Sequence, residues 1–165
     1  MIRPADSNET KVAWQCALEY DGPTALVLSR QSLPMSTNGD AVRSGAQTII
    51  AVDKPEVILV GTGSEVAVCI KAAELLQSQG LRANVVSMPS IDRFENQHQQ
   101  FKESIFIHNV PVVSVEAGVT FGWSRYADDA IGIDRFGASA PGSIVMSKLG
   151  IDADHVAGRA AALIR

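Results

Sequence analysis

The sequence predicts an α/β fold: a mostly parallel sheet covered by helices on both faces, preceded by a partial α/β segment. Three observations predict it. Short apolar runs alternate with amphipathic helical patterns along the second region, which is the order typical of parallel sheets. The runs lack polar alternation, as expected of strands buried on both faces. Turns that contain glycine or proline separate the elements and mark their ends.

The first region predicts a helix followed by a strand. Asp6 is a good N-cap, Glu9 completes a capping box, and apolar residues repeat on one face, so a helix is expected over residues 6–20. The apolar run of residues 24–29 predicts a strand covered on both faces. This strand would leave Arg30 at its carboxyl end, beside Gln31.

A loop or linker is expected over residues 34–45, because this stretch is rich in Ser, Thr, Asn, Gly and Pro and shows no apolar period. A possible strand over 47–52 leads into the second region. There, a buried strand over 56–60 and the turn at 61–63 precede a helix that opens at Ser64 and ends at Gly80. The later elements are strands over 83–87, 110–115 and 130–133, a polar helix over 91–101, a helix from Pro141 to Gly150, and a last helix capped by Asp152.

Composition excludes several classes of protein. Apolar residues make up 46% and charged residues 19% of the chain, which is a globular composition. The net charge is −4 and the basic residues are scattered, so we expect no nucleic-acid partner. No apolar run approaches the ~20 residues of a spanning helix, and the N-terminus lacks the apolar core of a signal peptide. We therefore expect no membrane association and a cytoplasmic location. Cys16 and Cys69 are expected to be core residues.

Arg30 is the best-placed candidate for ligand binding. Ligands of open α/β sheets gather outside the carboxyl ends of the strands, and the planar guanidinium can hold a phosphate through two hydrogen bonds. A salt bridge that pins the linker to the sheet would explain an arginine at this position equally well.

The turn Gly61-Thr62-Gly63-Ser64 could bind an anion, because a helix N-terminus offers unpaired N–H groups and a favourable dipole. It could also be only a tight crossover from strand to helix. The turn lacks the third glycine of a dinucleotide fingerprint and the lysine of a P-loop.

The remaining candidates do not form a catalytic set. His98, His108 and His155 are far apart in the sequence, and an isolated histidine is weak evidence for catalysis. Glu116, at the end of a strand, could accept hydrogen bonds from neighbouring amides or face a partner subunit. An aromatic cluster could cover the core or form a subunit contact; it consists of Phe121, Trp123 and Tyr126.

Six strings of the sequence together resemble the C-terminal portion of a transketolase, in the order of that family and over essentially the whole chain. The first string is RPAD, which begins at Arg3 and is followed by Asn8-Glu9. The others are GPTALVLSRQ from Gly22, GTGSEV from Gly61, VVSMPS from Val85, VEAGVTFGW from Val115 and GIDRFGASAP from Gly132.

The resemblance implies that residues 1–40 are the incomplete end of a pyrimidine-binding domain, 41–54 a linker and 55–165 the complete C-terminal domain. Transketolases transfer a two-carbon ketol unit between sugar phosphates of the pentose phosphate pathway, using thiamine diphosphate and Mg. By matching Ser29-Arg30-Gln31 to the family motif, the resemblance makes Arg30 the residue that binds the substrate phosphate. No residue of this chain is expected to be catalytic or to bind cofactor or metal.

The sequence lacks the family's diphosphate-binding domain, the glutamate that activates the cofactor, and the histidines and aspartates that contact the sugar. We therefore expect the chain alone to be inactive, and to need the missing N-terminal part of transketolase and homodimer contacts. Two alternatives remain: a free-standing regulatory domain that binds a phosphorylated metabolite or nucleotide at Gly61 to Ser64, and a pure association module.

Overall fold

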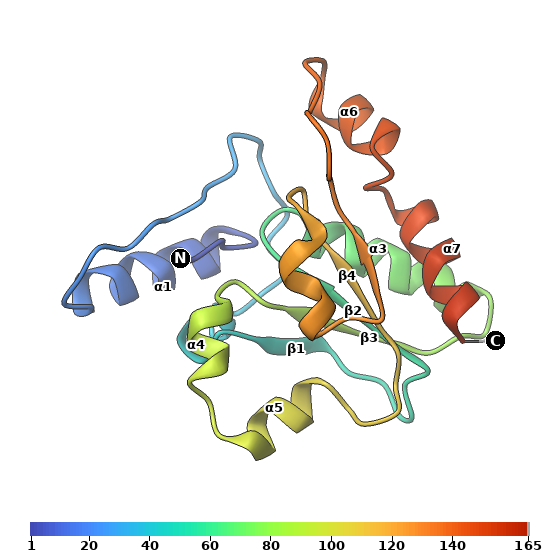
Figure 1. Ribbon diagram of the computed structural model, residues 1–165, viewed down its shortest axis with the longest axis horizontal. Helices are drawn as coiled ribbons and strands as arrows, with labels where there is room; N and C mark the ends of the chain where they lie inside the picture. Colours follow the sequence, from blue (N-terminus) through green and yellow to red (C-terminus); the bar gives the residue numbers. More distant parts are fainter. Residues whose placement is uncertain (165) are drawn as a thin grey trace.

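The computed structural model describes residues 1–164 and contains a five-stranded sheet with helices on both faces (Figure 1). The strand order is β1-β3-β2-β4-β5. β1 pairs antiparallel with β3, and the other three pairs are parallel. The predicted α/β fold is confirmed. The strands are β1 (Gln47–Ile50), β2 (Val57–Gly61), β3 (Ala83–Ser87), β4 (Val112–Val115) and β5 (Asp129–Ile131).

Two apolar cores form because successive side chains of each strand point to opposite faces of the sheet. On one face, Leu59 of β2 packs in a cluster with Leu76 of α3 and Val156 of α7. On the other face, Ile58 packs in a cluster with Phe94 of α4 and Trp123 of η1. The helices are α1 (Ser7–Glu19), α2 (Ala41–Ser44), α3 (Glu65–Ser78), α4 (Ile91–Glu95), α5 (Gln99–Ile105), the 3₁₀ helix η1 (Thr120–Arg125), α6 (Gly142–Lys148) and α7 (Ala153–Leu163).

The first region lies beside this sheet and does not add a ladder strand to it (Figure 1). The prediction of a strand covered on both faces over residues 24–29 is wrong. The segment makes only an isolated parallel bridge between Leu26 and Ile2, and Val27 and Leu28 are 43% and 48% exposed. No other segment of residues 1–164 pairs with it, and a single two-stranded contact is too little to form a sheet.

The predicted polar helix over residues 91–101 is two helices. α4 ends at Glu95 and α5 begins at Gln99. His98 has an extended backbone, and its Nδ1 accepts a hydrogen bond from the Phe101 N–H at 3.1 Å. The imidazole thus acts as the N-cap of α5, which begins a separate helix after the break at residues 96–98.

Other predictions from local sequence are confirmed. Asp6 caps α1, and Asp152 caps α7 by accepting a hydrogen bond from the His155 N–H. Cys16 and Cys69 are free and buried, and burial raises the pKa of the Cys69 thiol. None of the helices within residues 1–164 combines the length and the apolar character needed to cross a membrane.

Candidate functional site

Arg30 stands at the exposed tip of a short turn. The Ser29 hydroxyl donates to Gln31 Oε1 at 2.9 Å and accepts from the Gln31 N–H at 3.3 Å, so the residues on either side of Arg30 bond to each other. Arg30 is exposed, and its guanidinium has no hydrogen bond or ion pair with any of residues 1–164. Its five N–H donors are therefore available to an anion from outside the chain.

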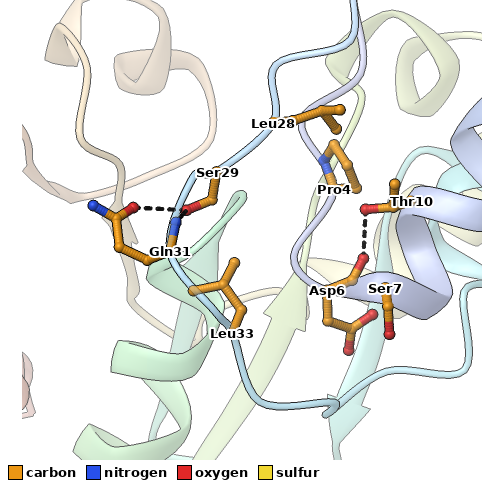
Figure 2. Close-up of a pocket in the computed structure, with 8 residues that line it drawn as sticks. All are labelled: Pro4, Asp6, Ser7, Thr10, Leu28, Ser29, Gln31 and Leu33. Atoms are coloured by element: carbon orange, nitrogen blue, oxygen red, sulfur yellow. Dashed lines mark hydrogen bonds between the residues drawn. The ribbon is translucent and has the colours of Figure 1, made fainter.

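A cavity of about 240 Å³ lies beside this turn (Figure 2). Figure 2 shows two segments facing each other across it. One segment carries Leu28, Ser29, Gln31 and Leu33, and the other carries Pro4, Asp6, Ser7 and Thr10. A larger groove of about 750 Å³ is also lined by Gln31 and Leu33, together with Ser64 and parts of α3, α6 and α7. The Arg30 turn therefore separates two hollows.

Asp6 fixes the far wall of the smaller cavity. Its Oδ1 caps α1 through the N–H groups of Asn8 and Glu9, and its Oδ2 accepts from the N–H groups of Ser36 and Thr37 at 2.7 and 2.8 Å. Burial alone would raise the pKa of Asp6, but these backbone hydrogen bonds outweigh it and lower the pKa below its usual value. The Asp6 carboxylate thus connects the segment around Ser36 and Thr37 to the start of α1.

Glu9 joins α1 to the end of β3. Its carboxyl group is fully buried and accepts from the Ala5 N–H at 2.7 Å and from the Ser87 hydroxyl at 2.6 Å. The predicted capping box is therefore displaced by one residue, because the box would place this bond on the Asp6 N–H. Burial raises the pKa of Glu9 against the opposing effect of its hydrogen bonds, and nearby Asp6 adds to the rise.

The turn at Gly61 to Ser64 is filled by the chain itself. The Gly63 N–H donates to the Arg3 carbonyl at 3.1 Å, and the Thr62 hydroxyl donates to the same oxygen at 3.4 Å. A Cβ on Gly63 would lie 2.8 Å from Arg3 Nε. The interpretation of this turn as a crossover from strand to helix fits this geometry. The Gly63 N–H already donates to the Arg3 carbonyl, so it is not available to an anion.

Arg3 also joins a buried carboxylate and a partly buried one beside that turn. Its guanidinium contacts Glu65 Oε2 at 2.5 Å and Glu116 Oε1 at 3.0 Å. The second oxygen of Glu116 accepts from Trp123 Nε1 at 2.7 Å. The prediction that Glu116 bonds to neighbouring amides is wrong, because its side-chain oxygens bond to these two side chains. The alternative that it faces a partner subunit stays a prediction. No local pattern in the sequence could indicate this cluster, because its members are far apart along the chain.

The aromatic cluster is divided between the core and the surface. Trp123 is 3% exposed and packs against Tyr126, with the ring centroids 6.3 Å apart, whereas Phe121 is 90% exposed. His155 lies against Gly150 near the start of α7. Across residues 1–164, no group of three or more His, Cys, Asp or Glu side chains is arranged to hold a metal ion.

Comparison with known proteins gives a consistent result. The family model described as the transketolase-like TK C-terminal domain matches residues 45–152. The transketolase of Halalkalibacterium halodurans is 43% identical over 175 aligned positions, which cover 99% of this chain and 26% of that protein. The chain thus spans about a quarter of the length of the curated relatives it matches.

Solved structures show the same likeness. A Pichia stipitis transketolase in complex with sedoheptulose 7-phosphate superposes with a TM-score of 0.94 at 38% identity, covering 99% of this chain and 25% of that one. A split-gene transketolase, solved as an inactive β4 tetramer, shares the fold with a TM-score of 0.81 at 21% identity, covering 99% of this chain and 58% of that one. The chain belongs to the transketolase family and corresponds to the C-terminal part of these enzymes.

Proposed function

We propose that this chain functions as the C-terminal part of a thiamine-diphosphate-dependent transketolase, in which Arg30 binds the phosphate of the sugar substrate. The whole enzyme would transfer ketol groups between sugar phosphates of the pentose phosphate pathway, in the cytoplasm. The chain alone would be inactive. The observation that carries the proposal is an exposed guanidinium, without a partner within residues 1–164, in a chain that matches transketolases along 99% of its length.

Phosphate is the anion that best suits Arg30. A guanidinium forms two parallel charge-assisted hydrogen bonds to a phosphate, which fix both distance and orientation. The two hollows flanking the Arg30 turn offer space for the rest of a ligand and for polypeptide from elsewhere. The relative from Pichia stipitis was solved with a sugar phosphate, and this supports the same class of substrate here.

The first region has the surface expected of a structure that another polypeptide completes. The N–H groups of Leu26 and Leu28 make no hydrogen bond within residues 1–164, so one edge of this extended segment is open to a further strand. On α1, Trp14 and Leu18 are 53% and 82% exposed. We propose that the N-terminal part of the enzyme covers this surface, and that exposed Phe121 contributes to homodimer contacts.

The residues present do not fit thiamine diphosphate. The glycine turn ahead of α3 donates its Gly63 N–H to the Arg3 carbonyl, and the carboxylates of Glu65 and Glu116 lie beside it. Two carboxylates would repel a diphosphate. We therefore place the binding of cofactor and Mg outside this chain, and derive no chemical step for either group from its residues.

Complementation tests the proposal. The purified chain with Mg and thiamine diphosphate should give no ketol transfer above buffer, and adding the N-terminal three quarters of the Halalkalibacterium halodurans enzyme should restore turnover. A robust rate from the chain alone, or no rate from the mixture despite complex formation, would overturn the assignment.

Arg30→Ala should weaken phosphorylated substrates in the restored enzyme by about 1–3 kcal/mol, or roughly 5- to 150-fold in KM, because a charge-assisted hydrogen bond is lost. Arg43→Ala is the matched control, since Arg43 is also an arginine outside the sheet domain and pairs with Glu19 at the surface. An unchanged KM for Arg30→Ala would refute the phosphate contact.

A further inference from the structure

We infer that Arg3 is a positioning residue: by joining Glu65 and Glu116, its guanidinium holds the segment that carries Arg30 in a fixed place on the C-terminal domain. The link to catalysis rests on the proposed function. The mechanical link stands on contacts of this chain alone.

The backbone of Arg3 is bound on both sides to the C-terminal domain. Its N–H donates to the Pro89 carbonyl at 2.8 Å, just after β3, and its carbonyl accepts from the Gly63 N–H at 3.1 Å, just after β2. Arg3 therefore lies across the carboxyl ends of two neighbouring parallel strands. Residues 1–3 therefore form a strap between the two regions, in addition to the bond from the Ser87 hydroxyl to Glu9.

The same strap holds the segment that leads to Arg30. The Ile2 N–H donates to the Ala25 carbonyl and the Val27 N–H donates to the Ile2 carbonyl, both at 2.9 Å. These two bonds are the backbone pairing that fixes residues 24–28. Because Ile2 is adjacent to Arg3 and Val27 is three residues before Arg30, a shift of Arg3 moves the base of the Arg30 turn directly.

The side chain locks the strap in place. The guanidinium is 16% exposed and contacts Glu65, at the start of α3 and fully buried, and Glu116, just after β4 and 22% exposed. Glu65 Oε2 also accepts from the Ala117 N–H at 3.1 Å, and Glu116 is held by Trp123. Both carboxylates therefore have fixed positions, and a two-pronged guanidinium between them can occupy one orientation.

Charge makes the lock dependent on arginine. One cation faces two carboxylates, and removing it would leave both acids without their cation in a poorly solvated place, which is strongly unfavourable. Lysine keeps the charge but is a single ammonium point, so it reaches one carboxylate well and the other poorly. Methionine keeps an unbranched apolar stem and removes the charge. The contacts of residue 3 with the two carboxylates thus weaken in the order Arg, Lys, Met.

The first experiment measures amide hydrogen exchange by NMR on the whole chain. Arg3→Met should speed exchange of the Val27 and Gly63 amides by about tenfold or more, while the amide of Val113 in β4 stays within about twofold, because local opening frees only the strap. Arg3→Lys should fall between. Arg43→Met is the matched control and should leave all three amides unchanged. Unchanged exchange of Val27 in Arg3→Met would refute the inference.

The second experiment uses the complemented enzyme. Arg3→Met should raise KM for a phosphorylated ketol donor by about fivefold or more and leave kcat/KM for a donor without phosphate within about twofold, because only the phosphate contact is misplaced. An equal loss with both donors would show a merely structural role and overturn the inference. Arg3→Lys should recover part of the KM.

Two further variants keep the outcomes separate. If Arg3→Met does not fold, Glu116→Gln replaces it, because the amide keeps the shape and an acceptor for Trp123 while halving the charge that faces Arg3; it should show the same KM pattern in weaker form. An Arg30→Ala enzyme with unchanged KM refutes the proposed function. An Arg30→Ala effect without any Arg3 or Glu116 effect refutes only the positioning role.

Discussion

The two regions of the chain contain similar apolar runs but bury them very differently. In the C-terminal domain, every residue of β2 is buried between two layers of helices. In the first region, the run of residues 24–29 also contains four consecutive apolar residues, yet Val27 and Leu28 are about half exposed. The difference teaches that an apolar run alone does not make a strand. Neighbouring strands and helices must also be present to pair with the run and cover its side chains.

The largest expected effect is on the free energy of unfolding when an apolar side chain is truncated in one region or the other. Leu59→Ala in β2 should destabilise the chain by about 2–5 kcal/mol, because a fully buried side chain is lost and a cavity remains. Leu28→Ala, at 48% exposure, should stay within about 0.5 kcal/mol in the isolated chain. Urea unfolding followed by circular dichroism measures both. Equal losses would contradict the view that the first region is incomplete by itself.

Much of the C-terminal domain could be predicted from sequence because its signals are local. The buried runs predicted β2 and β3 to within one residue, and the aspartates at positions 6 and 152 marked the helix starts through short-range hydrogen bonds. The break at His98 was missed, because an imidazole acting as an N-cap has no distinctive pattern in a polar stretch.

The site was only partly accessible from sequence, for a physical reason. Arg30 could be predicted as a candidate because its position after an apolar run and its chemistry are both visible locally, and its phosphate role stays a prediction that rests on the family resemblance. Arg3, Glu65 and Glu116 were missed as a group because they are separated by 62 and 51 positions, and only the folded sheet brings its strand ends together. Long-range polar clusters of this kind leave no periodic pattern in the sequence.

A smaller effect is expected at the turn where the regions meet. Gly63→Ala should destabilise the chain by about 1–3 kcal/mol, because φ is +61° and the new Cβ would lie 2.8 Å from Arg3 Nε. Gly122→Ala is the matched control, since φ is not positive and no atom lies within 4 Å of its Cβ position. Thermal unfolding compares the two. A Gly63→Ala variant as stable as the control would show that residues 1–3 can shift away from the new Cβ at little cost in free energy.

The smallest effect concerns pH and another contact between the regions, the buried Glu9 carboxyl group. Burial raises the pKa of Glu9 in the folded chain above the unfolded value near 4.5. Between these two pKa values the folded state holds more protons than the unfolded state, so this group's contribution to stability falls as pH rises through that window.

Glu9→Gln should remove this dependence. The amide oxygen can accept from the Ala5 N–H, and the amide nitrogen can donate to the Ser87 hydroxyl, so both contacts survive without a charge to bury. The variant should be as stable as the parent near pH 4 and more stable near pH 7, by about 1.4 kcal/mol for each unit of pKa shift removed. Asp6 titrates in the opposite sense: its lowered pKa gives stability that is lost as pH falls below about 3.8. Urea unfolding of both proteins at several pH values above 4 measures this, because the difference between parent and variant isolates Glu9 from the other carboxylates. A parent and variant that respond identically to pH would show that other charges or water stabilise the Glu9 carboxylate.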